Sequence, residues 1–375
     1  MSEHSRVVTH HTISSPEQLQ LFSLSHTARL AVLCERKYIY EGRETAFFVW
    51  DLLGNKKLMT GTMPPEAWVC FSLDDRFLAL ATTSSLVVFD SQRDWRQVAK
   101  IRVHFSVDEE EAIMEGLVFD DDGGFVLLLA RVYSFRRSRW ELKGVVVSTS
   151  TWTERALPCN ADWEFGAVLS TKCIVSSSNI SRGRVFFIAS CDGRCLAKQV
   201  TLLGLGFSIY LSFSLSLDRS LLLAYNHQTI TTYNFDAHTF TAISQRTTTS
   251  GIIHAALSHN NRFLATAECD RYSLDFPFTC SVYDLHTHTL LWRHREQQSR
   301  VSKRRFVCFS LHDRFVIVHL DNGEFVVRDI LTGDQVYWDE ETNHKRLIGN
   351  QNEHVWFSTD SLNNDKVHVY QVQDD

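Results

Sequence analysis

The chain has 375 residues, of which 44% are hydrophobic and 22% are charged, a balance that is typical of soluble globular proteins. This length would ordinarily indicate two or three domains, but closed all-β folds reach it as a single domain. The formal net charge of -6 disfavours a general attraction to nucleic acid or to an anionic membrane surface.

Nine cysteines are scattered along the chain, and no C-x-x-C motif occurs. Such a set argues against a disulfide framework and against a zinc site built from thiolates. Cys70 and Cys308 stand within apolar runs, where a reduced thiol serves as a small hydrophobic side chain. No secretory leader and no apolar stretch of about 18 residues occurs, so we expect a cytoplasmic or nuclear protein without a membrane span.

The first predicted strand covers residues 6–13, and after it a phrase of the form Phe/Leu-Ser-x-x-x-Arg-Phe/Leu begins to recur. The phrase predicts two apolar strands joined by a polar turn, because Asp, Asn and Ser hydrogen-bond their own backbone in tight turns. Clear copies span residues 24–30, 71–77, 257–263 and 309–315, and weaker copies span residues 119–125, 169–174 and 215–221.

A third and a fourth strand are predicted after the two strands that flank this turn. Nearly continuous apolar runs follow the turn, as expected of strands buried on both faces, at residues 77–81, 221–225, 263–267 and 315–319. Third strands end in an aromatic–acid pair or a variant of it, at residues 47–51, 86–90, 281–284 and 325–329. A turn at residues 331–334 introduces a fourth strand at residues 335–338, and Asn322-Gly323 predicts a tight hairpin before the third strand of that repeat.

Four short strands in each unit of roughly 40–50 residues are typical of a propeller blade. The chain resembles the WD-repeat family through Trp50-Asp51 and the variants Phe89-Asp90, Tyr283-Asp284 and Arg328-Asp329. The resemblance covers nearly the whole chain, although the absence of any Gly-His dipeptide leaves the family's His-Ser-Trp-Asp tetrad unassigned. The resemblance implies an all-β fold: a closed β-propeller of four-stranded antiparallel blades that serves as a binding platform.

Strands are also predicted near the C-terminus, at residues 345–348, 354–358 and 366–372. Together with the strand at residues 6–13 they make one four-stranded blade, so that the terminal strands close the ring and remove open sheet edges. We therefore expect one WD-repeat-like domain over residues 1–375 with eight blades. Seven blades, the commonest number in the family, is the alternative.

The longer insertions all fall on loops that emerge on one face of this fold. These loops join strands two and three of a blade, or one blade to the next, and the insertions cover residues 34–46, 105–115, 131–140, 269–280 and 293–305. Long loops on a rigid scaffold commonly carry binding residues, so we expect partner binding here.

The insertion at residues 131–140 interleaves four arginines with three aromatic residues. Guanidinium groups at Arg136, Arg137 and Arg139 would suit a phosphate or an acidic peptide, and a solvated hairpin tip is the plain alternative. Phe135-Arg-Arg-Ser138 also resembles the Phe-Arg-Arg-Gly motif of phosphoinositide-binding propellers, with serine in place of the glycine.

A second basic insertion carries Arg304 and Arg305, and the acidic run at residues 108–111 on the same face would be enough to balance these charges. Aromatic residues of the loops are candidate anchors for a partner; their alternative role is to fold back over the blade. These aromatic candidates are Tyr38, Tyr40, Tyr272, Phe276 and Phe278.

No sequence motif for catalysis is present: no G-x-S-x-G, no phosphate-binding glycine loop and no H-E-x-x-H. His286-x-His288 has no third ligand nearby, so we expect no metal, no cofactor and no enzyme activity. The favoured interpretation is a non-catalytic protein–protein interaction scaffold or adaptor, whose protein or peptide partner is acidic or phosphorylated where the arginines contact it. The alternatives are a propeller that binds phosphoinositides or nucleic acid, and a propeller-scaffold enzyme with a site in the central channel.

Overall fold

The computed structural model describes most of the predicted strands and the short turns between them. The described residues are 8–14, 19–25, 29–35, 44–52, 54–64, 66–105, 112–120, 123–135, 138–157, 165–170, 173–178, 185–189, 198–200, 212–216, 220–226, 228–235, 240–248, 250–269, 279–295, 307–310, 312–319, 325–338, 345–349, 355–360 and 366–372. Across these ranges every regular element is a β-strand except the short 3-10 helix η2 (Ser91–Arg93). The chain divides into two compact units, residues 20–202 and residues 1–19 with 203–375.

The unit of residues 20–202 contains four four-stranded antiparallel sheets, each hydrogen-bonded in chain order. The first sheet comprises β2 (Leu19–Leu24), β3 (Leu30–Glu35), β4 (Thr45–Asp51) and β5 (Lys56–Met63), and the second comprises β6 (Trp68–Phe71), β7 (Phe77–Ala81), β8 (Ser85–Asp90) and β9 (Arg96–Arg102). The third comprises β10 (Ala112–Phe119), β11 (Phe125–Ser134), β12 (Arg139–Ser148) and β13 (Glu154–Leu157), and the fourth comprises β14 (Phe165–Ser170), β15 (Cys173–Ser178), β16 (Val185–Ala189) and β17 (Lys198–Val200).

The other unit also contains four four-stranded sheets. The first comprises β18 (Ser212–Leu215), β19 (Leu221–Tyr225), β20 (Thr229–Phe235) and β21 (Phe240–Thr247), and the second comprises β22 (Gly251–Leu257), β23 (Phe263–Cys269), β24 (Thr279–Asp284) and β25 (Thr289–Arg295). The third comprises β26 (Val307–Phe309), β27 (Phe315–His319), β28 (Phe325–Asp329) and β29 (Gln335–Trp338), and the last comprises β30 (Lys345–Gly349), β31 (Val355–Asp360), β32 (Lys366–Val372) and β1 (Val8–Ser14).

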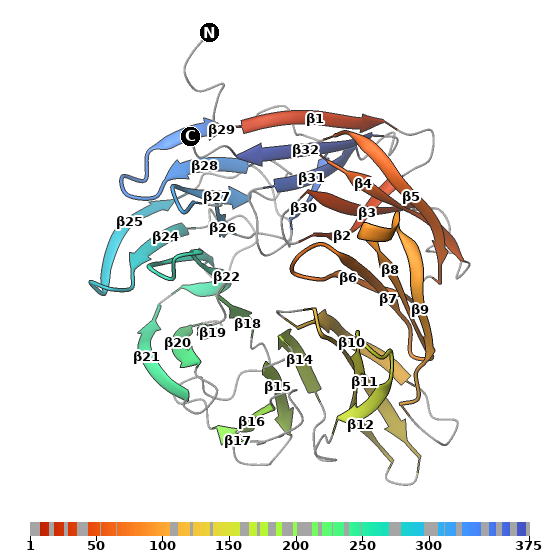
Figure 1. Cartoon of the computed structure of the whole chain (residues 1–375). Coiled ribbons are helices and arrows are strands. Elements are labelled where there is room, and N and C mark those ends of the chain that lie inside the picture. Colours follow the sequence, from red (N-terminus) through yellow and green to blue (C-terminus); the bar gives the residue numbers. More distant parts are fainter. Residues whose placement is uncertain are drawn as a thin grey trace. The chain divides into compact units, whose positions relative to one another are not determined.

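The last of these sheets joins the two ends of the chain. Strand β1 pairs antiparallel with β32, from Val8 opposite Val372 to Ser14 opposite Lys366. In Figure 1, β1 (red) and β32 (blue) lie side by side. This pairing confirms the prediction that three C-terminal strands and one N-terminal strand share a sheet.

The central strands are buried because their sequences are apolar on both sides of the pleat. Strand β7 is buried at every position, and its Phe77 stacks on Phe119 of β10 with 6.2 Å between ring centroids. The ring of Trp152 meets Phe77 edge-on at 6.1 Å, so three aromatic side chains fill the space between the second and third sheets. Burial of each large apolar side chain contributes about 1.5–3 kcal/mol, which makes this inter-sheet layer a main source of stability.

The serine of the recurring phrase closes the turn between the first and second strands. The Phe77 amide donates to Ser72 Oγ at 2.8 Å, and the Ser72 amide donates to the Phe77 carbonyl at 2.9 Å. In the turn between β10 and β11, Asp120 replaces serine and accepts from the Phe125 amide at 2.9 Å. The same serine contact occurs at Ser25, Ser216, Ser258 and Ser310.

The arginine of the phrase and the acid at the end of the third strand form one recurring ion pair. The pairs are Arg29–Asp51 at 3.1 Å, Arg76–Asp90 at 3.2 Å and Arg262–Asp284 at 3.0 Å. In two of them the arginine also lies over the phenylalanine that follows it. A single contact thus explains why both sequence features recur: it ties the first turn of a sheet to the end of its third strand.

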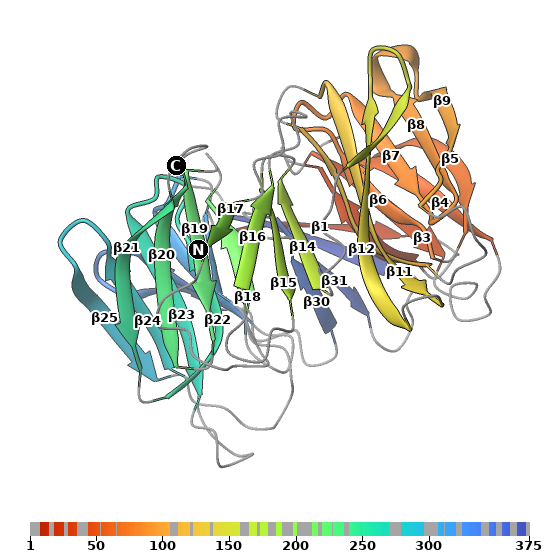
Figure 2. The same cartoon turned by 90° about the horizontal axis from the view of Figure 1, so that it is seen from below.

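The insertion expected at residues 131–140 is much shorter than the sequence suggested. Strands β11 and β12 have ten residues each and continue to Ser134 and from Arg139, and they are the long yellow arrows in Figure 2. The sequence prediction was wrong here because Arg131 and Tyr133 alternate with buried Val132 and Ser134, a strand pattern that the positive charges obscured. Asn322-Gly323 and most of the other insertions lie outside the described residues.

Candidate partner-binding site

Of the residues predicted to bind a partner, Arg139 lies within the described structure, as the first residue of β12. The others lie outside the described residues: Tyr38, Tyr40, Arg136, Arg137, Tyr272, Phe276, Phe278, Arg304 and Arg305. The part of the predicted binding surface that the structure describes is therefore the open end of the β11–β12 hairpin.

The two faces of this hairpin have different surroundings. Tyr133 lies opposite Trp140, and Ser134 lies opposite Arg139. Val132 belongs to the buried core shared with the β6–β9 sheet, and Ser134 on the same face is also buried. Because side chains alternate along a strand, Tyr133 and Trp140 project from the opposite face.

Three aromatic rings gather on that opposite face. The ring centroid of Tyr133 is 5.1 Å from Phe135 and 5.4 Å from Trp140, both in edge-to-face geometry. The Arg131 guanidinium lies over the Trp140 ring at 5.6 Å. Phe135 is 65% exposed, which is unusual for a phenylalanine that already has an aromatic neighbour.

Ile113 extends this apolar surface onto the neighbouring strand. It lies directly opposite Arg131 in the β10–β11 pairing and is 40% exposed. We name Ile113, Arg131, Tyr133, Phe135 and Trp140 the hairpin patch. Edge-to-face rings and a stacked guanidinium hold its side chains in place, so the patch presents a preformed surface.

The described arginines of the hairpin are already paired with carboxylates. Arg131 forms an ion pair with Glu115 of β10, and Arg139 Nε lies 3.8 Å from Glu141 Oε1. The charge that Arg139 was predicted to offer to a partner is therefore partly balanced within the sheet. Sequence reasoning missed both partners, because Glu115 becomes a neighbour of Arg131 only through the pairing of β10 with β11.

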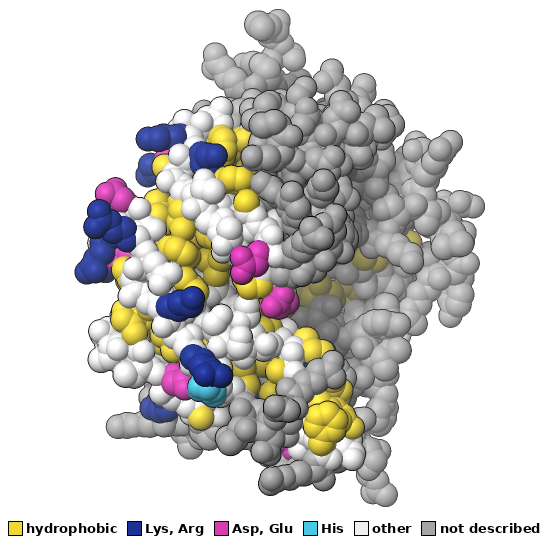
Figure 3. Space-filling model, turned by 90° about the vertical axis from the view of Figure 1, so that its right-hand side faces the viewer, with side chains coloured by type: hydrophobic (Ala, Val, Ile, Leu, Met, Phe, Trp, Pro, Cys, Tyr) yellow, Lys and Arg dark blue, Asp and Glu magenta, His cyan; other side chains and the backbone are white. Residues whose placement is uncertain are grey.

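Elsewhere on the molecule the described charges are mixed. Figure 3 shows Lys and Arg side chains in several groups on one face, with Asp and Glu side chains beside some of them and hydrophobic side chains between them. This mixed surface favours no long anionic chain such as nucleic acid over the described part of that face.

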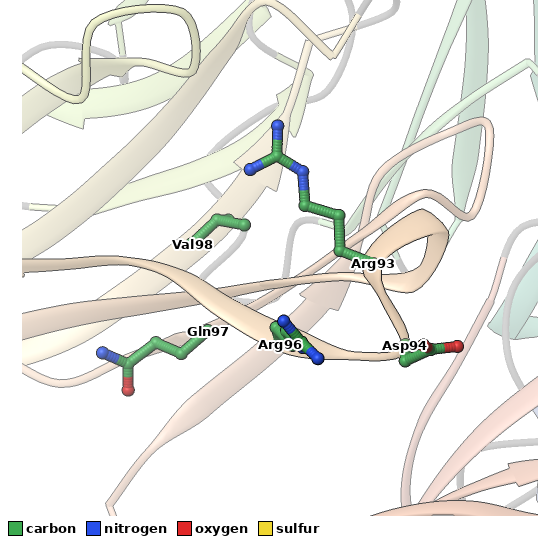
Figure 4. Close-up of a pocket in the computed structure, with 5 residues that line it drawn as sticks. All are labelled: Arg93, Asp94, Arg96, Gln97 and Val98. Atoms are coloured by element: carbon green, nitrogen blue, oxygen red, sulfur yellow. The ribbon is translucent and has the colours of Figure 1, made fainter.

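A hollow of about 540 Å³ lies beside the η2–β9 turn, lined by Arg93, Asp94, Arg96, Gln97 and Val98. Figure 4 shows that the polar side chains of this hollow point in different directions, with Arg93 extending upward and Gln97 to the left. Arg93 also lies 3.7 Å from the Asp90 carboxylate. A small-molecule site needs polar groups that converge on the ligand, so this hollow is not the candidate site.

His286 and His288 are exposed on the turn between β24 and β25. Within the described ranges, no three His, Cys, Asp or Glu side chains gather in a way that could hold a metal ion. No helix among the described elements is long and apolar enough to span a membrane.

The thiols of the described strands are mostly internal. Cys34, Cys280 and Cys308 are buried, and burial raises the pKa of the Cys70 thiol well above its ordinary value. A raised pKa disfavours the reactive thiolate at Cys70, and the three buried cysteines lie within the packed strands.

No protein-family model and no curated protein matches this sequence. The function therefore has to be argued from the repeated sheets and from the hairpin patch.

Proposed function

We propose that this chain is a non-catalytic interaction scaffold of the WD-repeat type, which binds a protein partner through the hairpin patch. The exposed, braced aromatic cluster around Phe135 carries this proposal. Aromatic and arginine side chains dominate the binding energy of protein interfaces, and an exposed apolar cluster of this kind is a common mark of an interaction site.

For the fold, we propose that the eight sheets are the blades of one closed propeller. Two features support this: each unit has four four-stranded sheets, and the same serine and arginine–aspartate contacts recur from sheet to sheet. An experimental density map at modest resolution would count the blades. Seven blades or an open row of sheets would contradict the proposal.

The patch suits binding because its side chains are ordered before a partner arrives. Arg131 is held by Glu115 and by the Trp140 ring, and Tyr133 stands between Phe135 and Trp140. Side chains that are fixed in advance lose little conformational entropy on association. In this proposal Phe135 is the anchor that inserts into an apolar pocket of the partner.

Charge adds selectivity to this anchor. Arg136 and Arg137 follow Phe135 directly in the sequence, whereas Arg131 and Arg139 are paired with carboxylates. The proposed partner therefore carries an apolar pocket with acidic or phosphorylated groups beside it. Apolar contact supplies affinity, and the two arginines favour acidic partners.

The test compares two exposed apolar residues at opposite ends of their sheets. Affinity purification with Phe135→Ala should lose a partner that the unchanged protein retains, since truncating an anchor costs about 2 kcal/mol or more. The control is Leu331→Ala in the turn between β28 and β29, because Leu331 is 62% exposed but lies at the other kind of loop. Equal loss of the partner with both variants, or with neither, would overturn the proposed site.

Charge reversal at Arg136, Arg137, Arg304 and Arg305 tests the electrostatic part. The proposal expects weaker binding with only moderate salt dependence, because the apolar anchor remains. If Phe135→Ala has no effect and binding falls steeply with salt, the ligand is instead a polyanion such as a phosphoinositide surface or nucleic acid.

A further inference from the structure

The β22–β25 sheet has one apolar face and one face that combines apolar with polar side chains. Ala265, Ala267 and Val282 pack into the core shared with the β26–β29 sheet. The alternate residues, among them Thr266 and Glu268, lie on the other face, and both are fully buried. Leu264 on this same face packs into the core shared with the β18–β21 sheet, so a buried charge and hydroxyl groups lie beside an apolar layer.

Glu268 already has a partner for each carboxylate oxygen. Thr266 Oγ1 donates to Oε1 at 2.9 Å, and Arg293 Nη2 forms an ion pair with Oε2. A fully buried carboxylate needs such contacts to stay charged. Both oxygens of Glu268 are thus engaged, one by Thr266 and the other by Arg293.

Arg246 also contacts this sheet, but no carboxylate among the described residues forms an ion pair with it. Its guanidinium, on edge strand β21, lies over the Tyr283 ring with 4.5 Å between its carbon and the ring centroid. Its Nε is buried and has no hydrogen-bond acceptor among the described residues. A buried, unsatisfied donor on a charged group destabilises the folded protein, so an acceptor at this position would be stabilising.

Charged groups from three strands act on the phenol of Tyr283. Burial and then Glu268 raise the pKa of Tyr283, while Arg293 and Arg246 lower it. Both arginines and the glutamate therefore act on the same phenol, and of these three groups Glu268 and Arg293 are paired with each other.

We propose that Arg246 is part of an oxyanion-binding site between the β18–β21 and β22–β25 sheets, and that its ligand is a carboxylate or a phosphate group. A guanidinium stacked on an aromatic ring keeps its in-plane N–H groups available, which is the geometry for two-pronged binding of such groups. Arg246 is half-buried and Arg293 is exposed, both on edge strands, so the site is reachable from solvent.

This site is separate from the hairpin patch, which belongs to the other compact unit. It lies beside Glu268, one residue before the end of β23, and Arg293, two residues before the end of β25.

The test uses inorganic phosphate and acetate as separate probes on the full chain, with sodium chloride keeping the ionic strength constant. We expect at least one probe to bind at millimolar concentration, followed by phosphorus line broadening for phosphate and by saturation transfer for acetate. The probe with the stronger response distinguishes a phosphate ligand from a carboxylate ligand. If neither probe binds up to about 50 mM, water alone satisfies Arg246 and the proposal is overturned.

Matched variants connect the response to Arg246. Arg246→Gln should weaken probe binding at least five-fold, and Arg246→Lys should recover only part of it because the planar donor pair is lost. Arg295→Gln removes one charge from the end of β25, where Arg295 is exposed, and should leave binding within two-fold. Equal weakening by Arg246→Gln and Arg295→Gln would mean unspecific charge attraction and would overturn the site.

Thermal unfolding without any probe separates ligand binding from a purely structural role. If Arg246 serves to hold Tyr283, Arg246→Met should lower the melting temperature. If Arg246 is available to bind an anion, Arg246→Met should leave the melting temperature unchanged or raise it, because an unsatisfied charge has been removed. A large drop in melting temperature together with unchanged probe binding by Arg246→Met would refute the proposal.

Discussion

The carboxylate of Asp284 makes several contacts that recur in the repeat. It pairs with Arg262 and accepts hydrogen bonds from the amides of His286 at 2.8 Å and Thr287 at 3.0 Å. Burial raises the pKa of Asp284, but the Thr287 amide, Arg262 and the His286 amide outweigh it, so the pKa lies below its ordinary value. The contacts thus favour the charged form, and the stability they provide is lost only when the pH falls through this lowered pKa.

We expect Asp284→Ala to lower the free energy of unfolding by about 1–3 kcal/mol, since two turn amides and a guanidinium lose their acceptor. Asp51→Ala is the matched control, because Asp51 pairs with the more exposed Arg29 and is itself less buried. Asp51→Ala should lower the free energy of unfolding by less than Asp284→Ala does. Urea unfolding of both variants measures the difference, and equal costs would contradict the view that burial strengthens the contact.

His254 is a partly buried base in β22 whose ring lies 6.4 Å from that of Tyr225 and whose Nδ1 accepts from the Val307 amide at 3.4 Å. Burial lowers the pKa of His254 to about 4. The unfolded chain binds a proton near the ordinary histidine pKa of about 6.5, so protonation favours unfolding between these two values. The stability that neutral His254 provides is present above this window and is lost as the pH falls through it.

Replacement of His254 by Gln should flatten this pH dependence. For the unchanged protein, we expect the free energy of unfolding to fall by up to about 3 kcal/mol between pH 6.5 and pH 4, beyond the contribution of other groups. His286→Gln on the exposed β24–β25 turn should keep the full slope. Chemical unfolding at several pH values tests this, and identical slopes for the two variants would show that His254 is not responsible.

At the scale of residues, the recurring phrase was recognisable in the sequence, and the structure shows which contacts its residues make. The serine and the aromatic–acid pairs were recognisable because each recurs at a fixed place relative to a strand. The pairing of Arg131 with Glu115 was not predictable, because it depends on a register that includes a bulge between Met114 and Gly116. Arg246 gave no sequence signal, since its isolation appears only when two sheets are packed together.

Among the elements, the β28–β29 turn shows how tightly the sheets are packed against each other. Gly333 has a φ of +75°, and a Cβ built on it would lie 2.8 Å from Cγ of Trp292. Trp292 is held by its own hydrogen bond to the Ile330 carbonyl at 2.8 Å, so it has little freedom to move. The turn therefore needs glycine for its backbone and also for its lack of a side chain.

Gly333→Ala should cost about 3 kcal/mol or more, of which roughly 1–2 kcal/mol is backbone strain and the rest is the collision with Trp292. Gly123→Ala isolates the backbone part, because Gly123 has a φ of +66° with no atom within 4 Å of a built Cβ. Thermal unfolding of the two variants should therefore show a clearly larger loss for Gly333→Ala. Similar losses would mean that Trp292 moves aside.

Strand existence was more predictable than strand length. Strands β7, β19, β27, β28, β29 and β32 have the predicted bounds, because their apolar runs are flanked by turn residues. The β11–β12 hairpin was misjudged because its outward residues are basic and aromatic, which resembles a loop in sequence. Its pairing continues four residues beyond the expected strand end, to Ser134 opposite Arg139.

For the whole molecule, the decisive prediction concerns the sheet that joins the two termini. Strand β1 protects the edge of β32 over seven paired positions. Removal of residues 1–18 would leave that edge open, and open edges promote both fraying and aggregation. Removal of residues 1–7, which precede β1, is the control.

We expect the longer deletion to lower the melting temperature and to speed hydrogen exchange at the amides of β32, while the shorter deletion leaves both unchanged. A synthetic peptide of residues 1–18 added to the longer deletion should restore protection at β32. Unchanged exchange in the longer deletion would show that β1 is not needed to close this sheet.

The pairing of β1 with β32 also sets an order of events during synthesis on the ribosome. Strand β1 is made before the other described strands and its partner β32 after them, so β1 stays unpaired while the strands between them are made. Its sequence VTHHTIS suits this delay, because it contains polar residues and two histidines and is poor in the long apolar side chains that drive aggregation. The last sheet can therefore be completed only after β32 has been made, and nascent chains halted before β32 should remain more sensitive to proteases near residue 8 than chains that contain β32.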